Sequence, residues 1–464
     1  MSLEFLEQLQ SIAKGIDEII SSSQRISVFS HWDADGICAA ALLAKLLLEK
    51  HKVFKIHFLR QLEEDRLEKL KNESSDLLIL LDFGSGQLHK TTFKEILQGR
   101  KVIIIDHHQI KEQYQVQHFY HVNPYLLGAS GEEISAAGVM YFLAKYLNPK
   151  LVKLAYLALV GAYGDRQERK EGFIGLNKYI LQDAESNKVV EVKHGLRIFG
   201  RLSKPLHKAI EQCTSIFIPG VSGNESGAVQ FLSELGIKLK DENGNWRRLS
   251  DLSLDEEMKL VTGIILQRLE NLSNPEDVFG NIYEIKGKED ILSDVYEFST
   301  LLNACGRLGE ASIGLSLCLG DKRYLETSKR LLQTYRKSIW SALEFVYENL
   351  GSSDIYVQEE RFTAILGGDK IPYNLTSTIT SLILNSTAFP TKEIVIVFAR
   401  MEEAVKVSVR SRAKSYNIGK LVREVAEELG GEGGGHLKAG GAKIESGKEH
   451  EFIRRFKEKL EISK

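Results

Sequence analysis

Apolar and polar positions in the first part of the chain follow two alternating spacings. Residues 1–20 carry apolar side chains three and four positions apart, which predicts an amphipathic helix. Beyond them, short apolar runs alternate with stretches of helical spacing. The runs cover residues 25–30, 76–81 and 101–105, and the helical stretches cover residues 36–49 and 92–98. Strands that alternate with helices predict an α/β fold in which helices cover both faces of a parallel sheet.

The rest of the chain predicts a helical insert, a long helix and a second α/β domain. Helical spacing continues after residue 190 but is interrupted at residues 219–227 and 241–246, which indicates a mostly helical insert. Apolar positions over residues 321–350 predict a helix about 45 Å long, enough to connect two domains. The later strands are expected at 362–366, 393–398 and 405–409, and the later helices at 421–429 and 449–460. The expected domains are 1–190, the insert 191–297, a return to the first domain with the connecting helix at 298–350, and a smaller α/β domain at 351–464.

Composition narrows the class of protein. A length of 464 residues fits two or three domains, and 43% hydrophobic with 27% charged residues is typical of a folded chain. The 61 basic and 63 acidic residues nearly cancel, which excludes a uniformly basic nucleic-acid-coating protein but permits a local basic groove. Apolar runs fall short of a membrane span, and the first residues lack the pattern of a secretory signal. We therefore expect a cytoplasmic protein without a membrane partner.

The most specific chemical pattern follows the first predicted strand. It reads His31-x-Asp33-x-Asp35-Gly36 and places one imidazole beside two carboxylates. Carboxylates packed this closely repel one another, and a cation relieves the repulsion. The alternative is a helix N-cap, in which Asp35 caps the helix predicted from residue 36. A cap accounts for only one aspartate, so the pattern favours a metal site.

Other predicted elements also end in metal-ligating side chains. These follow the runs 76–81 and 101–105 and the apolar helix predicted at 151–160. The residues are Asp82, Asp106, His107, His108 and Asp165. Ligands bind at the carboxyl ends of the strands in open α/β sheets, so we expect these side chains to meet. The set suits two divalent cations that share a carboxylate, and Asp/His ligation favours Mn²⁺ or Mg²⁺ over structural zinc. The residues therefore predict a metal-dependent phosphoesterase.

A glycine cluster and two arginines in the last domain predict an anion site. Residues 430–441 read GGEGGGHLKAGG, and glycines let the backbone approach an anion beside His436. The alternative is a flexible linker, but a strand pattern and a helix follow within the same domain. Arg410 and Arg412 share one face of a predicted strand. They either pair with surface carboxylates or hold a phosphate bidentately, and the nearby glycines favour the phosphate.

These segments together resemble the DHH phosphoesterase superfamily. The matching residues are His31, Asp33, Asp35, Gly36, Asp82, Asp106, His107, His108 and Asp165 in the order of that family, and Gly433, Gly434, Gly435 and His436 of its DHH-associated C-terminal domain. Residues 301–309, LLNACGRLG, resemble a segment of RecJ-type single-strand exonucleases. The resemblance covers residues 20–445 except the insert, and the layout is most similar to archaeal RecJ-like nucleases.

The resemblance implies a role for each of these residues. One Mn²⁺ or Mg²⁺ would be held by His31, Asp33 and Asp82, and a second by Asp35, Asp82, His107 and Asp165, with Asp82 as the bridge. Asp106 would orient the site or add a ligand, and His108 would contact the scissile phosphate. The substrate would be held by Asn303 and Arg307, and by Arg410, Arg412, Gly433, Gly434, Gly435 and His436.

The expected function is an exonuclease that hydrolyses single-stranded DNA or RNA to mononucleotides in DNA repair or replication. Resemblance implies 5′→3′ polarity on DNA. One alternative is a phosphodiesterase of short oligonucleotides or cyclic dinucleotides. Another is a replisome scaffold with a secondary nuclease, whose insert binds a GINS-type replication complex. The insert could instead be a satellite core that braces the fold.

Overall fold

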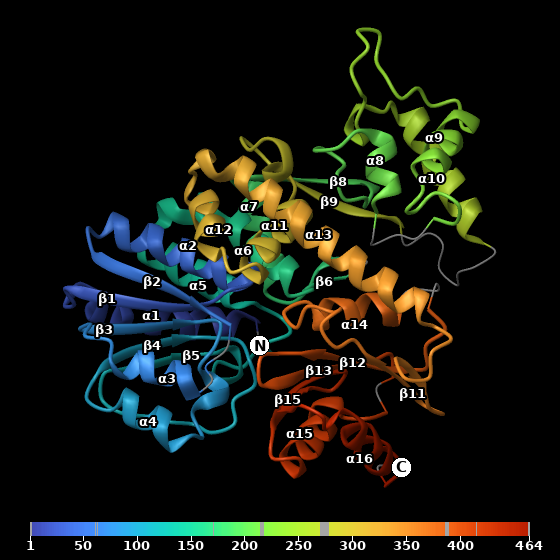
Figure 1. Cartoon of the computed structure of the whole chain (residues 1–464). Coiled ribbons are helices and arrows are strands. Elements are labelled where there is room, and N and C mark those ends of the chain that lie inside the picture. The colour runs from blue at the N-terminus through green and yellow to red at the C-terminus, as the bar shows by residue number, and fades with distance from the viewer. Residues whose placement is uncertain are drawn as a thin grey trace. The chain divides into compact units, whose positions relative to one another are not determined.

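A five-stranded parallel sheet lies at the centre of the N-terminal part of the chain (Figure 1). The strands are β1 (Arg25–His31), β2 (Val53–Leu59), β3 (Leu77–Leu81), β4 (Lys101–Ile105) and β5 (Phe119–Val122). They lie in the order β2-β1-β3-β4-β5, so the three predicted strands are the central ones. The predicted parallel sheet is confirmed. Sequence patterning missed the edge strands because Lys55 and His57 interrupt β2, and β5 has only 4 residues.

The computed structural model describes residues 2–60, 62, 64–169, 171–213, 218–269, 278–385, 389–413 and 415–462. Its contacts divide the chain into two units, Met1–Leu332 and Gln333–Lys464. The division falls inside helix α13 (Leu325–Glu348), which a short 3-10 turn precedes at Lys322–Tyr324. The helix has 24 residues and is about 36 Å long, shorter than the sequence predicted.

Helices cover both faces of the parallel sheet because successive residues of a strand point to opposite faces. On one face, Leu78 and Leu80 pack with α3 (Glu64–Lys71) and α4 (Thr91–Leu97). On the other face, Ile79 and Ile103 lie beside α1 (Ser2–Ser21), α2 (Ala34–Glu49) and α5 (Ala136–Leu147). Each of these leucines and isoleucines is at most 1% exposed, and such burial contributes about 1.5–3 kcal/mol per side chain.

Further helices extend the α2–α5 layer. They are α6 (Ala155–Gly164), α7 (Asn177–Ser186), α11 (Val295–Arg307) and α12 (Ala311–Leu319). Helix α6 packs against α2, α5 and α11. The helix expected at 151–160 starts as a 3-10 turn, Pro149–Leu154, because Asn148 and Pro149 form a capped turn before α6 begins.

The insert emerges from an antiparallel strand pair that the sequence did not predict. Strand β8 (Val190–Leu196) pairs with β9 (Phe279–Ile285). Between them lie α8 (Leu206–Glu211), α9 (Glu225–Glu234) and α10 (Leu254–Leu269). Apolar side chains of the three helices form a separate core, which includes Leu206, Leu232, Leu260 and Ile264. The insert thus has a hydrophobic core of its own.

The C-terminal unit contains a six-stranded mixed sheet in the order β10-β11-β12-β13-β15-β14. The strands are β10 (Tyr356–Gln358), β11 (Phe362–Leu366), β12 (Ile394–Arg400), β13 (Ala404–Ser411), β14 (Glu432–His436) and β15 (Ala439–Glu445). In addition to α13, this unit contains the helices α14 (Thr376–Asn385), α15 (Ile418–Glu428) and α16 (Glu449–Ile462). This unit is the smaller α/β domain that the sequence predicted.

Among the described residues, we find no helix with the length and hydropathy needed to cross a membrane.

Candidate metal centre

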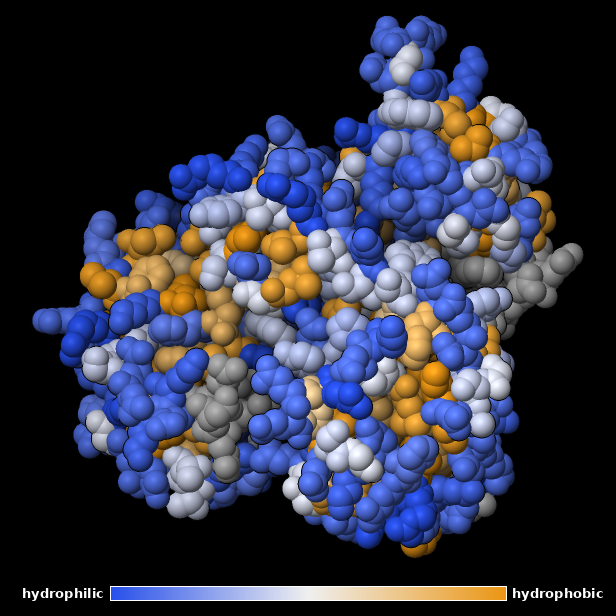
Figure 2. All heavy atoms as spheres, in the orientation of Figure 1, coloured by the Kyte–Doolittle hydropathy of each residue, from blue (hydrophilic) through white to orange (hydrophobic). Residues whose placement is uncertain are grey.

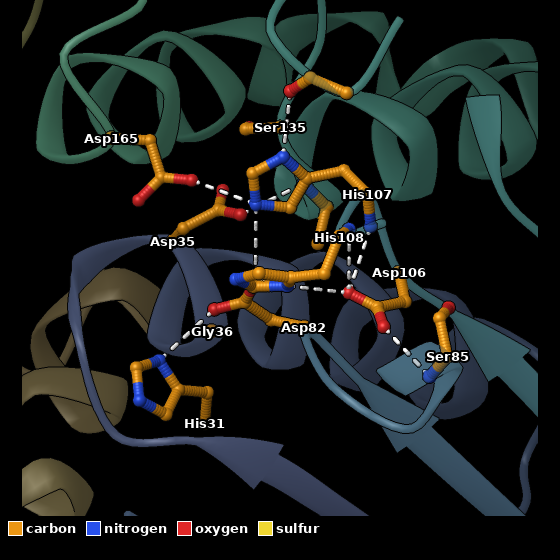
Figure 3. A network of polar contacts seen from close by, with 12 residues as sticks. His31, Asp35, Gly36, Asp82, Ser85, Asp106, His107, His108, Ser135 and Asp165 are labelled. Atoms are coloured by element: carbon orange, nitrogen blue, oxygen red, sulfur yellow. Dashed lines mark hydrogen bonds and ion pairs between the residues drawn. The ribbon is translucent and has the colours of Figure 1, made fainter. Parts of the chain in front are cut away.

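Metal-ligating side chains meet at the carboxyl edge of the parallel sheet (Figure 3). His31 ends β1, Asp82 follows β3, and Asp106 to His108 follow β4. Asp165 caps the carboxyl end of α6. Because parallel strands end at the same edge, residues far apart in the sequence come within reach of one another.

The turn after β1 joins two helices through its two aspartates. Asp33 is the N-cap of α2 and accepts a hydrogen bond from the Gly36 amide at 3.1 Å. Asp35 accepts hydrogen bonds from the Ala136 and Ala137 amides, 2.8 and 3.0 Å away, at the start of α5. The alternative interpretation, in which Asp35 caps the helix, is therefore wrong. The cap is Asp33, because α2 begins two positions earlier than the spacing indicated.

Three overlapping groups of side chains could each hold a cation. They are His31, Asp33 and Asp82; Asp35, Asp82, His107 and Asp165; and Asp82, His107 and His108. The ligand atoms of each group lie within 4.8 Å of one another. Asp82 belongs to all three. The first two groups are the sets that the resemblance implied.

Distances within the groups are short. His31 Nδ1 lies 2.9 Å from Asp33 Oδ2 and 3.1 Å from Asp82 Oδ2. His107 Nε2 lies 2.9 Å from Asp165 Oδ2 and 3.5 Å from Asp82 Oδ1. Asp82 is 2% exposed and has a φ of 61°, a left-handed conformation that aspartate tolerates better than most residues. The residue shared by all groups is thus buried and has a left-handed backbone.

Crowding of the carboxylates shifts their pKa values. Burial raises the pKa of Asp35 well above its usual value, and the charges of Asp82 and Asp165 raise it further. Burial lowers the pKa of His31 and His107, but the adjacent aspartates outweigh burial and raise both pKa values well above the usual one. The site thus gathers positive charge to offset its carboxylates.

A divalent cation fits this set of donors. Asp82 Oδ1 is buried and meets no hydrogen-bond partner in the described part of the chain. A carboxylate oxygen in that state costs free energy unless a cation or a donor satisfies it. Carboxylate oxygens with imidazole nitrogens are ligands that Mn²⁺ and Mg²⁺ accept. The residues therefore fit the cations that the sequence predicted.

Asp106 forms a hydrogen-bonded pair with His108, which belongs to the third group of the cluster. Asp106 is fully buried and accepts hydrogen bonds from the amides of Ser85 (2.9 Å), His107 (2.8 Å) and His108 (3.2 Å). It also lies 2.8 Å from His108 Nδ1. Burial opposes ionisation of Asp106, but His108 and His107 outweigh it and hold the pKa far below its usual value. Asp106 lies in none of the three groups, so the geometry favours an orienting role over ligation.

Sequence reasoning missed the residues that hold this pair. Ser85 Oγ lies 2.8 Å from His121 Nε2 and accepts a hydrogen bond from Asn123 Nδ2 at 2.9 Å. Asn123 also donates to the His108 carbonyl at 3.0 Å. The only local signal was the Asn123-Pro124 turn.

Family models match three segments of the chain. They are the DHH family N-terminal domain at residues 25–162, the DHH-CID domain at 198–278 and the DHHA1 domain at 370–461. The chain belongs to the DHH phosphoesterase superfamily. The first segment contains every residue of the three candidate groups except Asp165. The resemblance on which the sequence prediction relied is thereby confirmed.

Comparisons with individual proteins match nearly the whole of this chain. The uncharacterized protein MJ0831 of Methanocaldococcus jannaschii is 29% identical over 468 residues, 98% of each chain. RecJ of Thermus thermophilus, solved with Mn²⁺, shares the fold with a TM-score of 0.59 and 20% identity, over 97% of this chain and 54% of RecJ. CDC45 of Entamoeba histolytica shares it with a TM-score of 0.60 and 14% identity, over 98% of both. This chain thus has a RecJ-like fold and spans about half of that RecJ.

Residues 301–309, at the end of α11, pack against the turn of the DHH domain. Asn303 Oδ1 accepts a hydrogen bond from the Ala34 amide at 3.0 Å. A Cβ on Gly306 would lie 1.8 Å from the Trp32 carbonyl oxygen, so only glycine allows α11 to approach this closely. Arg307 is the last residue of α11. The predicted contacts of Asn303 and Arg307 with a nucleotide stay predictions, although the Asn303 oxygen already braces the turn.

The glycine cluster of the DHHA1 domain forms a β-hairpin, so the alternative of a flexible linker is wrong. Gly433, Gly434, Gly435 and His436 lie on β14, which pairs with β15. A Cβ on Gly433 or Gly440 would lie 2.9 or 2.6 Å from a side-chain atom of α15, so these glycines let the helix pack directly on the hairpin. A Cβ on Gly434 would meet no atom within 4 Å. The His436 side chain lies outside the described residues.

Arg410 lies on β13, whereas Arg412 directly follows the last residue of that strand, Ser411, so the two arginines do not share a strand as predicted. Arg410 donates to Ser377 Oγ at 2.5 Å and to the Val409 carbonyl at 2.9 Å. Arg412 donates to the Leu384 carbonyl and to Thr391 Oγ1. These acceptors are neutral oxygens, and a charged phosphate oxygen is a stronger acceptor for a guanidinium than any of them. The predicted contacts of the two arginines with phosphate stay predictions.

Proposed function

We propose that this DHH protein is a divalent-metal-dependent phosphodiesterase that degrades single-stranded DNA or RNA from an end. The observation that carries the proposal is the position of Asp82, which belongs to every group able to hold a cation at the sheet edge. Its buried Oδ1, which accepts no hydrogen bond from the described residues, favours a ligand shared by two neighbouring sites.

The side chains at the sheet edge would act as cation ligands or would contact the substrate. His31, Asp33 and Asp82 would hold one Mn²⁺ or Mg²⁺, and Asp35, Asp82, His107 and Asp165 a second. Bound cations would stabilise the charge that develops at phosphorus during in-line displacement. Asp106 would hold the His108 ring through Nδ1, so that His108, whose side chain is 43% exposed, reaches the scissile phosphate.

The single-strand preference and the polarity rest on the resemblance to RecJ-type exonucleases. A single strand can thread one backbone past the cations, whereas a duplex is too wide and stiff to do so. We propose 5′→3′ polarity on DNA and a role in repair or replication. Phosphate contacts and cations read the backbone, so only 2′-hydroxyl contacts would separate RNA from DNA.

A degradation assay in Mn²⁺ tests this proposal. Long single-stranded DNA, long RNA, blunt duplex, dinucleotides and cyclic dinucleotides would be compared, with a label at either end. Release of labelled mononucleotide from the 5′ end of long single strands is the expected result. Faster turnover of dinucleotides or cyclic dinucleotides would favour the short-substrate alternative. Rapid digestion of blunt duplex would refute the single-strand claim.

A second function, protein docking, is favoured by the exposed surface of the insert. Leu260 and Ile264 of α10 pack inside the insert core, whereas Leu254, Met258 and Leu266 are 76%, 61% and 60% exposed. Figure 2 shows apolar surface over the insert helices. The first turn of this helix is acidic and contains Asp255, Glu256 and Glu257. We propose that the stripe Leu254, Met258 and Leu266 binds a protein partner, a GINS-type replication complex by resemblance, and that the insert core merely supports it.

A further inference from the structure

One backbone carbonyl links His107 to two buried amide side chains outside the DHH motifs. The Gly131 carbonyl oxygen lies 2.8 Å from His107 Nδ1, and Gln167 Nε2 donates to the same oxygen at 2.9 Å. Gln167 Oε1 in turn accepts a hydrogen bond from Asn177 Nδ2 at 2.8 Å. Asn177 Nδ2 also donates to the Glu133 carbonyl at 3.2 Å. A continuous chain of hydrogen bonds therefore runs from α7 to the imidazole.

Burial of Gln167 and Asn177 makes the loss of any of these hydrogen bonds costly. Gln167 is 4% exposed and Asn177 is fully buried, so water cannot replace a lost partner cheaply. The segment is also held by sterics, because a Cβ on Gly131 would lie 1.8 Å from the His107 carbonyl oxygen. The Gly131 carbonyl is thus held by a hydrogen bond from Gln167 in a segment that packs closely on the His107 backbone.

The position of this carbonyl decides which nitrogen of His107 keeps its proton when the ring binds a cation. A carbonyl oxygen accepts hydrogen bonds only, so Nδ1 must be the donor. The other nitrogen, Nε2, faces Asp82 and Asp165 at 3.5 and 2.9 Å. A histidine that ligates a metal needs this arrangement, with a fixed donor on one ring nitrogen and a lone pair on the other.

We propose that Gln167 and Asn177 are positioning residues of the metal centre. They fix the Gly131 carbonyl and so hold the His107 ring in the tautomer and orientation that a divalent cation requires. The inference rests on the proposed function, because it assigns His107 as a ligand. It adds two residues that lie outside the matched DHH segment at 25–162.

Mn²⁺ binding to the substrate-free protein tests the proposal. Free Mn²⁺ would be followed by electron paramagnetic resonance in titrations of the wild type, Gln167→Met and Asn177→Ala. Methionine keeps the length of the glutamine side chain but donates no hydrogen bond. Loss of the direct hydrogen-bond partner of a metal-bound histidine typically costs about 10–100-fold in affinity. Gln167 acts through that partner, the Gly131 carbonyl, so we expect a loss of about tenfold for Gln167→Met. Asn177→Ala acts one bond further away, so its loss should be smaller.

A matched control separates positioning from general loosening. Tyr141 is fully buried on α5 and donates to Asp183 Oδ2 at 2.9 Å, with no link to Gly131. Tyr141→Phe removes one buried hydrogen bond, so it should lower the melting temperature and leave Mn²⁺ affinity unchanged. The double variant Gln167→Met/Asn177→Ala should bind no worse than Gln167→Met, because both act through the same carbonyl.

Three results would overturn the proposal. Wild-type affinity in Gln167→Met, or in Asn177→Ala should Gln167→Met not fold, would show that the amides only fill the core. Equal weakening by Tyr141→Phe would show that any lost hydrogen bond loosens the site. A wild-type protein that binds neither Mn²⁺ nor Mg²⁺ would refute the proposed function and the positioning role together, a result distinct from the other two.

Discussion

Asp33 and Asp35 stand two positions apart and bond to the first turns of two different helices. Asp33 accepts from Gly36 of α2, and Asp35 accepts from Ala136 and Ala137 of α5. Helix N-termini favour negative charge, so both carboxylates are held at the positive ends of helices. Gly161 makes room for this arrangement, since a Cβ there would lie 2.6 Å from Asp35 Oδ1. The fold thus stabilises carboxylates that it has crowded together.

Asp82→Asn should abolish turnover without unfolding the protein. Asparagine tolerates the left-handed φ of 61°, whereas alanine would add strain. Loss of the shared carboxylate would disturb both proposed cation sites, so we expect kcat on a labelled oligonucleotide to fall by at least about 10³-fold. Asp76→Asn, which changes an aspartate just before the same strand, is the control and should stay active. Half of the wild-type activity in Asp82→Asn would refute the two-cation assignment.

Arg410→Ala should weaken binding of single strands more than it slows chemistry. A hydrogen bond to a charged group contributes about 1.5–3 kcal/mol, so we expect about tenfold weaker binding or more. Lysine would restore only part of the affinity, because it lacks the bidentate geometry. Fluorescence anisotropy with a labelled oligonucleotide would measure this, and kcat at saturation would be compared. Arg400→Ala, at an arginine that pairs with Asp369, is the control. Unchanged affinity would count against the phosphate contact.

Gly306→Ala should separate α11 from the turn of the DHH domain. The added Cβ would meet the Trp32 backbone oxygen at 1.8 Å, and a backbone atom cannot rotate away. We expect a loss of about 1–3 kcal/mol in the free energy of unfolding, together with reduced activity. Gly314→Ala on α12 is a milder control, since its nearest atom is a side-chain carbon of Leu302 at 3.1 Å. Equal effects of the two variants in urea unfolding would contradict this account.

Acid should destabilise the insert through one ion pair. Glu256 accepts hydrogen bonds from Arg247 at 2.6 and 2.8 Å, and these lower the pKa of Glu256 to about 2. Because the folded pKa lies below the unfolded one, the stabilisation is complete above the usual value of 4.5 and is lost as the pH falls towards 2.

Glu256→Gln should therefore cost about 1 kcal/mol at pH 7 and almost nothing near pH 2. Trp246 lies within the insert, so its fluorescence during urea unfolding reports on this module. Asp255→Asn removes an exposed partner of Lys259 and should change little at either pH. A cost of Glu256→Gln that persists at pH 2 would exclude this ion pair as its origin.

Substitution of the exposed stripe on α10 should abolish docking and spare catalysis. Leu254 and Met258 are largely exposed, so Leu254→Ser/Met258→Ser should leave the insert core and the nuclease unchanged. Affinity for a purified GINS-type complex would be measured beside nuclease activity in Mn²⁺. Leu48→Ser, at an exposed leucine of α2, is the control. Retained affinity in the double variant would rule out this stripe as the docking surface.

Local patterns predicted the parts of the site whose chemistry is unusual. Three apolar runs ended in Asp or His, and the carboxyl ends of parallel strands meet, so the meeting of His31, Asp82 and His107 followed from topology alone. The partners of those residues could not be found in this way. Asp35 meets Ala136 across 101 positions, and His107 meets Gly131 through a backbone carbonyl that carries no sequence signal.

Glycine was the main source of error. The cluster at 430–441 was interpreted as backbone that approaches an anion, with a flexible linker as the alternative, and neither interpretation predicted the hairpin. In the DHHA1 domain, several of these glycines are needed because they have no side chain, which lets α15 pack directly on β14 and β15. Close approach and conformational freedom give the same sequence pattern, and only the neighbouring helix distinguishes them.

The strand pair β8–β9 has a consequence for how this architecture can be changed. Leu196 and Phe279 face each other at the end of the pair, so the insert leaves and rejoins the chain at a single point. A short turn between them would close a hairpin, and a different module could be grafted there without a new linker. Recognition could then diversify between lineages while the catalytic layer stayed the same, because the exchange would touch no strand of the parallel sheet.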